Sequence, residues 1–206
     1  VQSLVVFNSK LYGATGTTGL LLEWNGTNAW TKVADELNSQ TVIQHCCVYN
    51  SKIYGGTASG GRLFEWNGTN AWVEKAGQLN SETNIRWLAV HNNKLYGVTS
   101  PGCRLFEWND SNAWVEKAGQ AGSETVLFSL ISFDGILYAS TYPLGKLYKW
   151  NGTDAWVEVD GQLSSQTYAF GLTSFNSKLY AGTDPDGNLF ESSATTTTTT
   201  STTTTS

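Results

Sequence analysis

Charged residues, histidines and long apolar runs are all scarce in this sequence of 206 residues. Only 14% of the residues are charged, and the net charge of −5 offers no basic patch to nucleic acid or to an anionic membrane. No apolar run approaches the roughly 20 residues of a bilayer-spanning helix. No window shows a period near 3.6 residues, which excludes helical repeats. With 40% hydrophobic and 13% aromatic residues, the composition predicts a globular domain with one sizeable core.

Methionine and cysteine are the next scarce residues. Methionine is missing even from position 1, where the strand-like pattern "VQSLVVFNSK" begins. We therefore expect a processed N-terminus, such as one left by a cleaved signal peptide, although a trimmed chain would look the same. Adjacent Cys46 and Cys47 should point to opposite faces of a strand, so at most one of them can meet Cys103. We expect buried free thiols, and their spacing is not that of metal ligands.

What the sequence does contain is an internal repeat of 42 residues without insertions or deletions. Five tyrosines and five threonines recur at this spacing: Tyr12, Tyr54, Tyr96, Tyr138 and Tyr180, with Thr15, Thr57, Thr99, Thr141 and Thr183. Two tryptophan series keep the same register and leave out only Trp87: Trp24, Trp66, Trp108 and Trp150, then Trp30, Trp72, Trp114 and Trp156. A period of this length is typical of propellers and related repeat proteins.

Each period predicts four short strands. In the second copy they are residues 43 to 49, 53 to 57, 62 to 66 and 71 to 76, with Gly, Asn, Ser and Asp in the connections. Both faces of these strands are apolar: in "RLFEW", Leu63 points one way, and Phe64 and Trp66 point the other. Such strands need cover on both sides, which radially stacked blades supply. We therefore predict an all-β fold, a five-bladed β-propeller of near-identical four-stranded repeats.

The segment "NSKIYGG" at residues 50 to 56, followed by an aromatic strand and a Trp after "NGTNA", resembles the kelch repeat. In that repeat a Gly pair ends one strand, an aromatic residue ends the next and a Trp opens the fourth. The resemblance covers residues 1 to 191 and implies kelch-type blades, but only Gly55 and Gly56 form a full Gly pair. The repeat length is closer to that of the Trp-Asp repeat. We take only the blade type from this resemblance.

The fifth copy is incomplete. Ser192 stands where a Trp is expected, and "SSATTTTTTSTTTTS" replaces the fourth strand. We therefore divide the chain into a propeller at residues 1 to 191 and a Thr/Ser-rich tail at residues 192 to 206. Three uses of the tail stay open: a fourth strand for its own blade, a strand or linker that reaches a neighbouring molecule, or an O-glycosylated stalk. The candidate residues for O-glycosylation or assembly are Thr195, Thr196, Thr197, Thr198, Thr199, Thr200, Ser201, Thr202, Thr203, Thr204 and Thr205.

The turn before the fourth strand carries an N-glycosylation pattern in each complete copy: Asn25, Asn67 and Asn151 stand in Asn-Gly-Thr, and Asn109 stands in Asn-Asp-Ser. Asn-Gly is also the favoured two-residue hairpin turn, so a purely structural role stays open. The third copy loses the Gly yet keeps Asn109 and Ser111, which favours glycosylation and hence a secreted or cell-surface protein. In the usual propeller course, the four acceptors ring one face.

The opposite face is expected to collect the second-to-third turns and the entrances of the innermost strands, which differ between copies. This divergence indicates either a surface where each copy meets something different or relaxed loops. The entrance positions are Gln2, Gln44, Arg86, Phe128 and Phe170, followed by Ser3, His45, Trp87, Ser129 and Gly171. From this region the candidate ligand face comprises Gln44, His45, Arg86, Trp87, Phe128, Phe170 and Tyr142.

The sequence shows no arrangement that is typical of an active site. His45 and His91 occupy non-equivalent repeat positions, which favours ordinary strand residues over ligands. The glutamates of the third strands sit at equivalent places in separate blades and do not form an acid and base pair. The segment "DPDG" at residues 184 to 187 lacks the oxygen ligands of a calcium loop and is predicted to be a turn. We expect no enzyme, metal or cofactor.

These features predict a non-enzymatic, secreted, glycosylated propeller that serves as a structural subunit of a surface or fibrous assembly. Its partners would be further copies, bound head to tail through the Thr-rich tail, or other surface proteins. The alternative is a multivalent carbohydrate-binding propeller, with one shallow site per blade built from the repeated aromatic residues. Neither function requires nucleic acid or membrane insertion.

Overall fold

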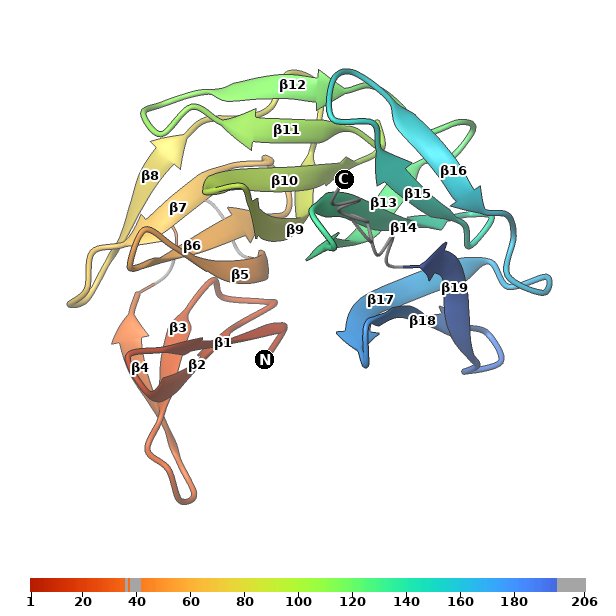
Figure 1. Ribbon diagram of the computed structural model, residues 1–206. Helices are drawn as coiled ribbons and strands as arrows, with labels where there is room; N and C mark the ends of the chain where they lie inside the picture. Colours follow the sequence, from red (N-terminus) through yellow and green to blue (C-terminus); the bar gives the residue numbers. More distant parts are fainter. Residues whose placement is uncertain (36, 38–41, 196–206) are drawn as a thin grey trace, which may run out of the picture.

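The computed structural model describes residues 1–35, 37 and 42–195 and confirms the all-β fold. Five antiparallel sheets, called blades 1 to 5 in chain order, surround a common axis (Figure 1). Blades 1 to 4 each have four strands in sequential order, and blade 5 has three. The described residues contain no helix, and so none that is long and apolar enough to cross a membrane.

The strands repeat with nearly constant bounds. Blade 1 contains β1 (Ser3–Phe7), β2 (Lys10–Ala14), β3 (Leu21–Trp24) and β4 (Trp30–Ala34), and blade 2 contains β5 (Ile43–Tyr49), β6 (Lys52–Thr57), β7 (Leu63–Trp66) and β8 (Trp72–Ala76). Blade 3 contains β9 (Asn84–His91), β10 (Lys94–Ser100), β11 (Leu105–Trp108) and β12 (Trp114–Ala118). Blade 4 contains β13 (Val126–Phe133), β14 (Ile136–Tyr142), β15 (Leu147–Trp150) and β16 (Trp156–Asp160). Blade 5 contains β17 (Tyr168–Phe175), β18 (Lys178–Asp184) and β19 (Leu189–Thr195).

The last strand differs from the sequence prediction, which ended it at residue 191. β19 continues to Thr195, because the start of β18 offers a further backbone partner: Lys178 pairs with Thr195 after a register shift. β-branched threonine suits this extension. Residues 196–206, which hold the rest of the predicted tail sites and the predicted fourth strand, lie outside the described residues.

Packing between blades buries both faces of the inner sheets. In three successive interfaces the repeated tyrosine of one blade contacts the first-series tryptophan of the next, with ring centroids 5.2 to 5.6 Å apart: Tyr12 with Trp66, Tyr54 with Trp108, and Tyr96 with Trp150. The second-series tryptophan packs within its own blade. A Cβ on Gly55 would lie 3.1 Å from Ile43 and 3.4 Å from the ring of Trp72, so the backbone of β6 packs closely against both. Both tryptophan series therefore belong to the core.

The cysteines are free thiols, as the sequence predicted. Cys46 and Cys103 are buried and Cys47 is partly buried. Burial raises the pKa of Cys47 and that of Cys103 to about 12, so neither is ionised near neutral pH. They act as small apolar side chains between blades.

Replacing Phe106 with Ala should lower the free energy of unfolding by about 3 to 5 kcal/mol, because the side chain is fully buried between blades 2 and 3. The matched control is Val115→Ala on the exposed outer strand β12, which should cost less than about 1 kcal/mol. Denaturant unfolding measures both. Equal losses would contradict the interface as the main source of stability.

Candidate functional site

Residues from all five blades line a pocket of about 160 Å³ at the propeller axis, called the axial pocket, and blade 3 contributes two of them. Because the copies have equal length, the same repeat position returns to the axis in every blade. The lining residues are Gln2, Gln44, Arg86, Trp87, Phe128 and Phe170. Five of the seven candidate ligand-face residues are therefore brought together, and Gln2 joins them.

The two remaining candidates lie beside the axial pocket. Tyr142 stacks on Tyr168, with ring centroids 4.3 Å apart, and Tyr168 stacks in turn on Phe170 at 5.0 Å. His45 lines a second, adjoining pocket of about 480 Å³ together with Trp87 and the start of β1. Sequence reasoning missed Tyr168, although an aromatic residue replacing Val42, Asn84 and Val126 at the same repeat position is a signal that could have identified it.

The axial pocket has an aromatic side and a polar side. Blades 4 and 5 contribute Phe128 and Phe170, whose ring centroids are 4.9 Å apart, and Phe170 is 46% exposed. Blades 1 to 3 contribute Gln2, Gln44 and Arg86, and blade 3 also contributes Trp87. A stacked aromatic surface next to amide and guanidinium groups can bind an apolar or planar group together with a polar one.

Arg86 is the charged group of the axial pocket. Its Cζ atom lies 5.4 Å from the ring centroid of Phe128, in a cation–π contact, and its Nε donates to Ser100 Oγ at 3.1 Å. Burial lowers the pKa of Arg86, but a guanidinium in a protein stays charged. None of the ion pairs found among the described residues involves Arg86, whereas Arg62 and Arg104 pair with Glu74 and Glu116.

His45 connects blades 2 and 3. Its Nδ1 accepts the backbone N–H of Leu88 at 3.3 Å, and its ring stacks on Trp87 at 3.9 Å. At the same repeat position, Ser3 and Ser129 accept backbone N–H groups of the next blade. Burial lowers the pKa of His45 from its ordinary value of 6.5 to about 3, so the ring is neutral. It therefore positions blades, in agreement with its prediction as a strand residue.

The four predicted glycosylation sites lie in equivalent exposed turns. In each, the Asn Oδ1 accepts the backbone N–H groups two, three and four residues later, as Asn67 does from Thr69, Asn70 and Ala71 at 2.9 to 3.1 Å. The asparagine therefore has a structural role in every copy. This geometry neither requires nor prevents a glycan, because attachment occurs at Nδ2.

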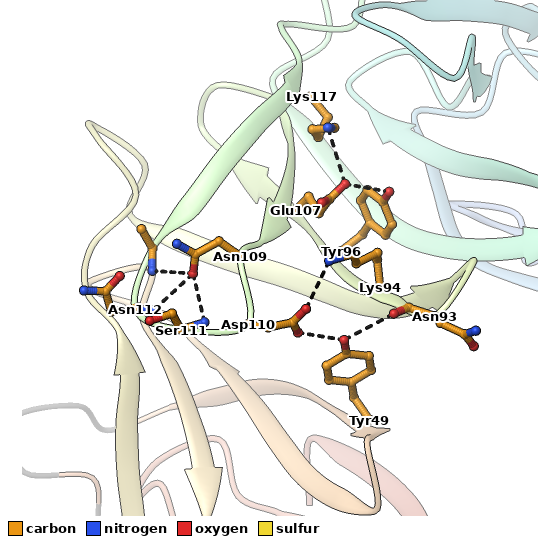
Figure 2. A network of polar contacts seen from close by, with 11 residues as sticks. Tyr49, Asn93, Lys94, Tyr96, Glu107, Asn109, Asp110, Ser111, Asn112 and Lys117 are labelled. Carbon is orange, nitrogen blue, oxygen red and sulfur yellow. Dashed lines mark hydrogen bonds and ion pairs between the residues drawn. The ribbon is translucent and has the colours of Figure 1, made fainter.

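The turn of blade 3 keeps its shape without glycine. Asp110 has a positive φ of 61°, and the glycines at the same repeat position, Gly26, Gly68 and Gly152, have positive φ values of 84° to 87°. Its carboxylate accepts the Tyr49 hydroxyl of blade 2 at 2.7 Å and the Lys94 ammonium at 3.1 Å (Figure 2). The loss of glycine therefore has a structural explanation, and it no longer favours glycosylation over a turn role at Asn109.

The remaining polar residues that the sequence pointed to have structural partners. Glu23, Glu65 and Glu107 accept hydrogen bonds from the repeated tyrosines of their own blades at 2.7 to 2.9 Å. The "DPDG" segment connects β18 and β19, and Asp186 bonds to Gln166. Within the part of the chain that the structure describes, no group of His, Cys, Asp and Glu could hold a metal ion.

Replacing His45 with Asn should weaken the loss of stability in acid. The folded chain holds His45 neutral down to about pH 3, while the unfolded chain takes up the proton near 6.5, so this contribution to stability falls as the pH drops below about 6.5. One such group contributes at most about 1.4 kcal/mol per pH unit. Denaturant unfolding at several pH values, for both chains, measures the difference. Parallel curves would contradict a depressed pKa.

Peptide mapping of natively sourced protein should find sugar on Asn25, Asn67 and Asn151. These side chains are exposed and hold their turns through Oδ1, so a glycan on Nδ2 leaves the turn bonds intact. We expect lower occupancy at Asn109, whose turn is tied to blade 2 through Tyr49 and Asp110. Enzymatic deglycosylation provides the control. Four unmodified asparagines would remove the argument for secretion.

No protein-family model and no curated protein matches this sequence. Solved structures match its fold. YCF48 bound to D1 peptide has a TM-score of 0.66 at 14% identity, over 91% of this chain and 62% of that one. Virginiamycin B lyase from Staphylococcus aureus with quinupristin has a TM-score of 0.70 at 13% identity, and the match covers 92% of this chain and 68% of the lyase chain. The WD40 β-propeller domain of Doa1 has a TM-score of 0.66 at 13% identity, and the match covers 93% of this chain and 64% of the Doa1 chain.

This chain therefore spans 62% to 68% of the length of these structures. Identities this low concern the fold alone, and one of the three proteins is an enzyme by name. The matches do not single out the kelch type of blade that the sequence resembles. The chain is a repeat-blade β-propeller.

Proposed function

We propose that this chain is a non-catalytic binding propeller whose axial pocket receives a carboxylate on a peptide segment of a partner protein. The observation that carries the proposal is Arg86, a partly buried cation with no carboxylate partner among the described residues. A desolvated guanidinium gains most from a planar carboxylate, to which it can donate two parallel hydrogen bonds.

The size and walls of the pocket favour a chain end or a side chain over a whole small molecule. Its volume of about 160 Å³ is below the range of roughly 300 to 1,000 Å³ that small-molecule sites occupy. The stacked rings of Phe170, Tyr168 and Tyr142 extend from the pocket and provide an apolar surface for the residues next to the carboxylate. YCF48, which shares the fold, is described as bound to a peptide, which supports this class of ligand.

Catalysis has little support in the axial pocket. Its lining contains amides, aromatic rings and one guanidinium, and none of these is a nucleophile or a general base near neutral pH. The nearby His45 already uses Nδ1 to accept a backbone N–H, and burial keeps the pKa of this ring low. A group that cannot exchange a proton at neutral pH is a poor acid or base catalyst.

The two functions predicted from the sequence stay as proposals beside this one. A lectin with one site per blade would need exposed repeated aromatics, but Trp66 and Trp108 are buried between blades. If the chain binds sugar, the partly exposed aromatic surface of Tyr142, Tyr168 and Phe170 in blades 4 and 5 would offer one site instead of one per blade. The assembly function through the Thr-rich tail involves residues 196–206, outside the described part of the chain.

Replacing Arg86 with Gln should weaken peptide binding at least about tenfold, because a hydrogen bond to a charged group contributes about 1.5 to 3 kcal/mol. The probe is a panel of fluorescent hexapeptides with apolar C-terminal residues, each prepared with a free carboxylate and as the amide. Fluorescence anisotropy should show tighter binding of the carboxylate forms, with Arg86→Lys intermediate.

Arg62→Gln is the matched control, because Arg62 pairs with Glu74 on the surface and does not line the axial pocket. It should bind the peptides as the unaltered chain does. Equal binding of acids and amides, or an unchanged Arg86→Gln variant, would overturn the proposal. Titration with neutral oligosaccharides distinguishes the lectin alternative from peptide binding. The lectin alternative predicts that sugars bind without a free carboxylate.

A further inference from the structure

The four interfaces between blades are built from the same repeat positions. Each blade has a forward face, which packs on the next blade, and a backward face, which packs on the blade before it. Leucines of the third strands lie on the forward faces and are fully buried: Leu21, Leu63, Leu105 and Leu147. The backward faces present apolar residues of the first strands, equally buried: Ile43, Cys46, Ile85, Leu88, Leu127, Leu130 and Ala169.

The backward face of blade 1 has apolar residues at these positions too, but no other blade covers them in the described part of the chain. Leu4 is 57% exposed, whereas Leu88 and Leu130 at the same repeat position are 1% and 2% exposed. Val1 and Val6 on the same face are also exposed. Trp24 packs on Trp30 of its own blade and stays partly exposed, whereas its counterparts Trp66 and Trp108 are buried against a tyrosine of the preceding blade.

The forward face of blade 5 lacks cover in the same way. Leu189 is 71% exposed, whereas the equivalent Leu147 is 2% exposed. Phe175 is exposed and Tyr180 partly exposed. A Cβ on Gly182 would meet nothing within 4 Å, but one on the equivalent Gly56 would collide with Ile85 of the next blade.

Within the described residues, blades 1 and 5 do not cover each other. The innermost strands pack in sequence, β1 on β5, β5 on β9, β9 on β13 and β13 on β17. Among the described residues, β17 makes no comparable contact with β1, and blades 1 and 5 stand apart in Figure 1. The five blades form an open arc whose two ends carry opposite halves of one interface.

We propose that a second copy of this chain covers these ends, with the forward face of blade 5 docked on the backward face of blade 1 of the next copy. Tyr180 of one copy then takes the place against Trp24 of the other that Tyr12 takes against Trp66 at 5.4 Å. We choose a second copy as the partner because the two exposed faces are the two halves of an interface that the chain already forms four times between its own blades. Exposed apolar faces of this extent mark association sites.

The joint between copies lacks a hydrogen bond that three of the four internal interfaces contain. In those three, a backbone N–H donates to the side chain of Ser3, His45 or Ser129. The equivalent residues of blades 3 and 5 are Trp87 and Gly171, and neither has a side-chain acceptor. The contact is heterologous, because it joins two different faces of the chain. Copies therefore form a closed ring if the rotation from one copy to the next adds up to a full turn, and an open filament if it does not. Association is therefore reversible and depends on protein concentration.

Sedimentation velocity over a wide concentration range should show association that either Leu189→Asp or Val6→Asp weakens at least tenfold, because each places a charge in an apolar joint. The decisive sample is a mixture of the two variants. Each retains one intact face, so the mixture should form one-to-one dimers and nothing larger, while each variant alone stays monomeric. Far-ultraviolet circular dichroism and thermal unfolding check that both variants are folded.

Val115→Asp is the matched control, because Val115 is exposed on β12 and lies on neither end face; it should associate as the unaltered chain does. Removing residues 196–206 should also leave association in place, which separates this joint from tail-mediated assembly. A monomer at every concentration, as closure of blade 5 on blade 1 of the same chain would give, overturns the proposal. So does association that both face variants leave unchanged.

Discussion

Each blade of this propeller is a sheet with two apolar faces, and neither face can be buried within the blade itself. The contact between the tyrosine of one blade and the tryptophan of the next, surrounded by leucine and isoleucine, supplies the missing cover. Single repeats of this kind cannot be stable alone, because their apolar area is removed from water only by neighbours. The arc, the pocket and the exposed ends all follow from this constraint.

The same constraint separates the positions that repeat from those that vary. Residues between blades must fit a neighbour of nearly constant shape, and they recur with little change. Residues at the axis, such as Gln44, Arg86 and Phe128, point into a small shared pocket and can differ without disturbing an interface. The axis is therefore where five similar blades acquire one asymmetric site, polar on one side and aromatic on the other.

The repeated asparagine turn shows how structure and modification can use the same residue. Its Oδ1 holds three backbone N–H groups, which explains the repetition without a glycan. At blade 3, Asp110 replaces glycine and bonds Tyr49 of the neighbouring blade. The pattern of Asn, any residue, then Thr or Ser therefore has a full structural explanation in this fold. Whether a glycan is attached is decided by chemical analysis of the protein.

The sequence by itself determined the all-β blades, their strand bounds within a residue or two and the core tryptophans, because strand period and turn chemistry are local and the repeat presents them several times. It also singled out the variable positions at the axis. Only the tertiary structure showed that Tyr168 belongs with them, that Asp110 explains the missing glycine, and that β19 extends to Thr195. The tertiary structure likewise decided that the five described blades form an open arc, since the angle between successive blades comes from packing across interfaces and leaves no periodic signal in the chain.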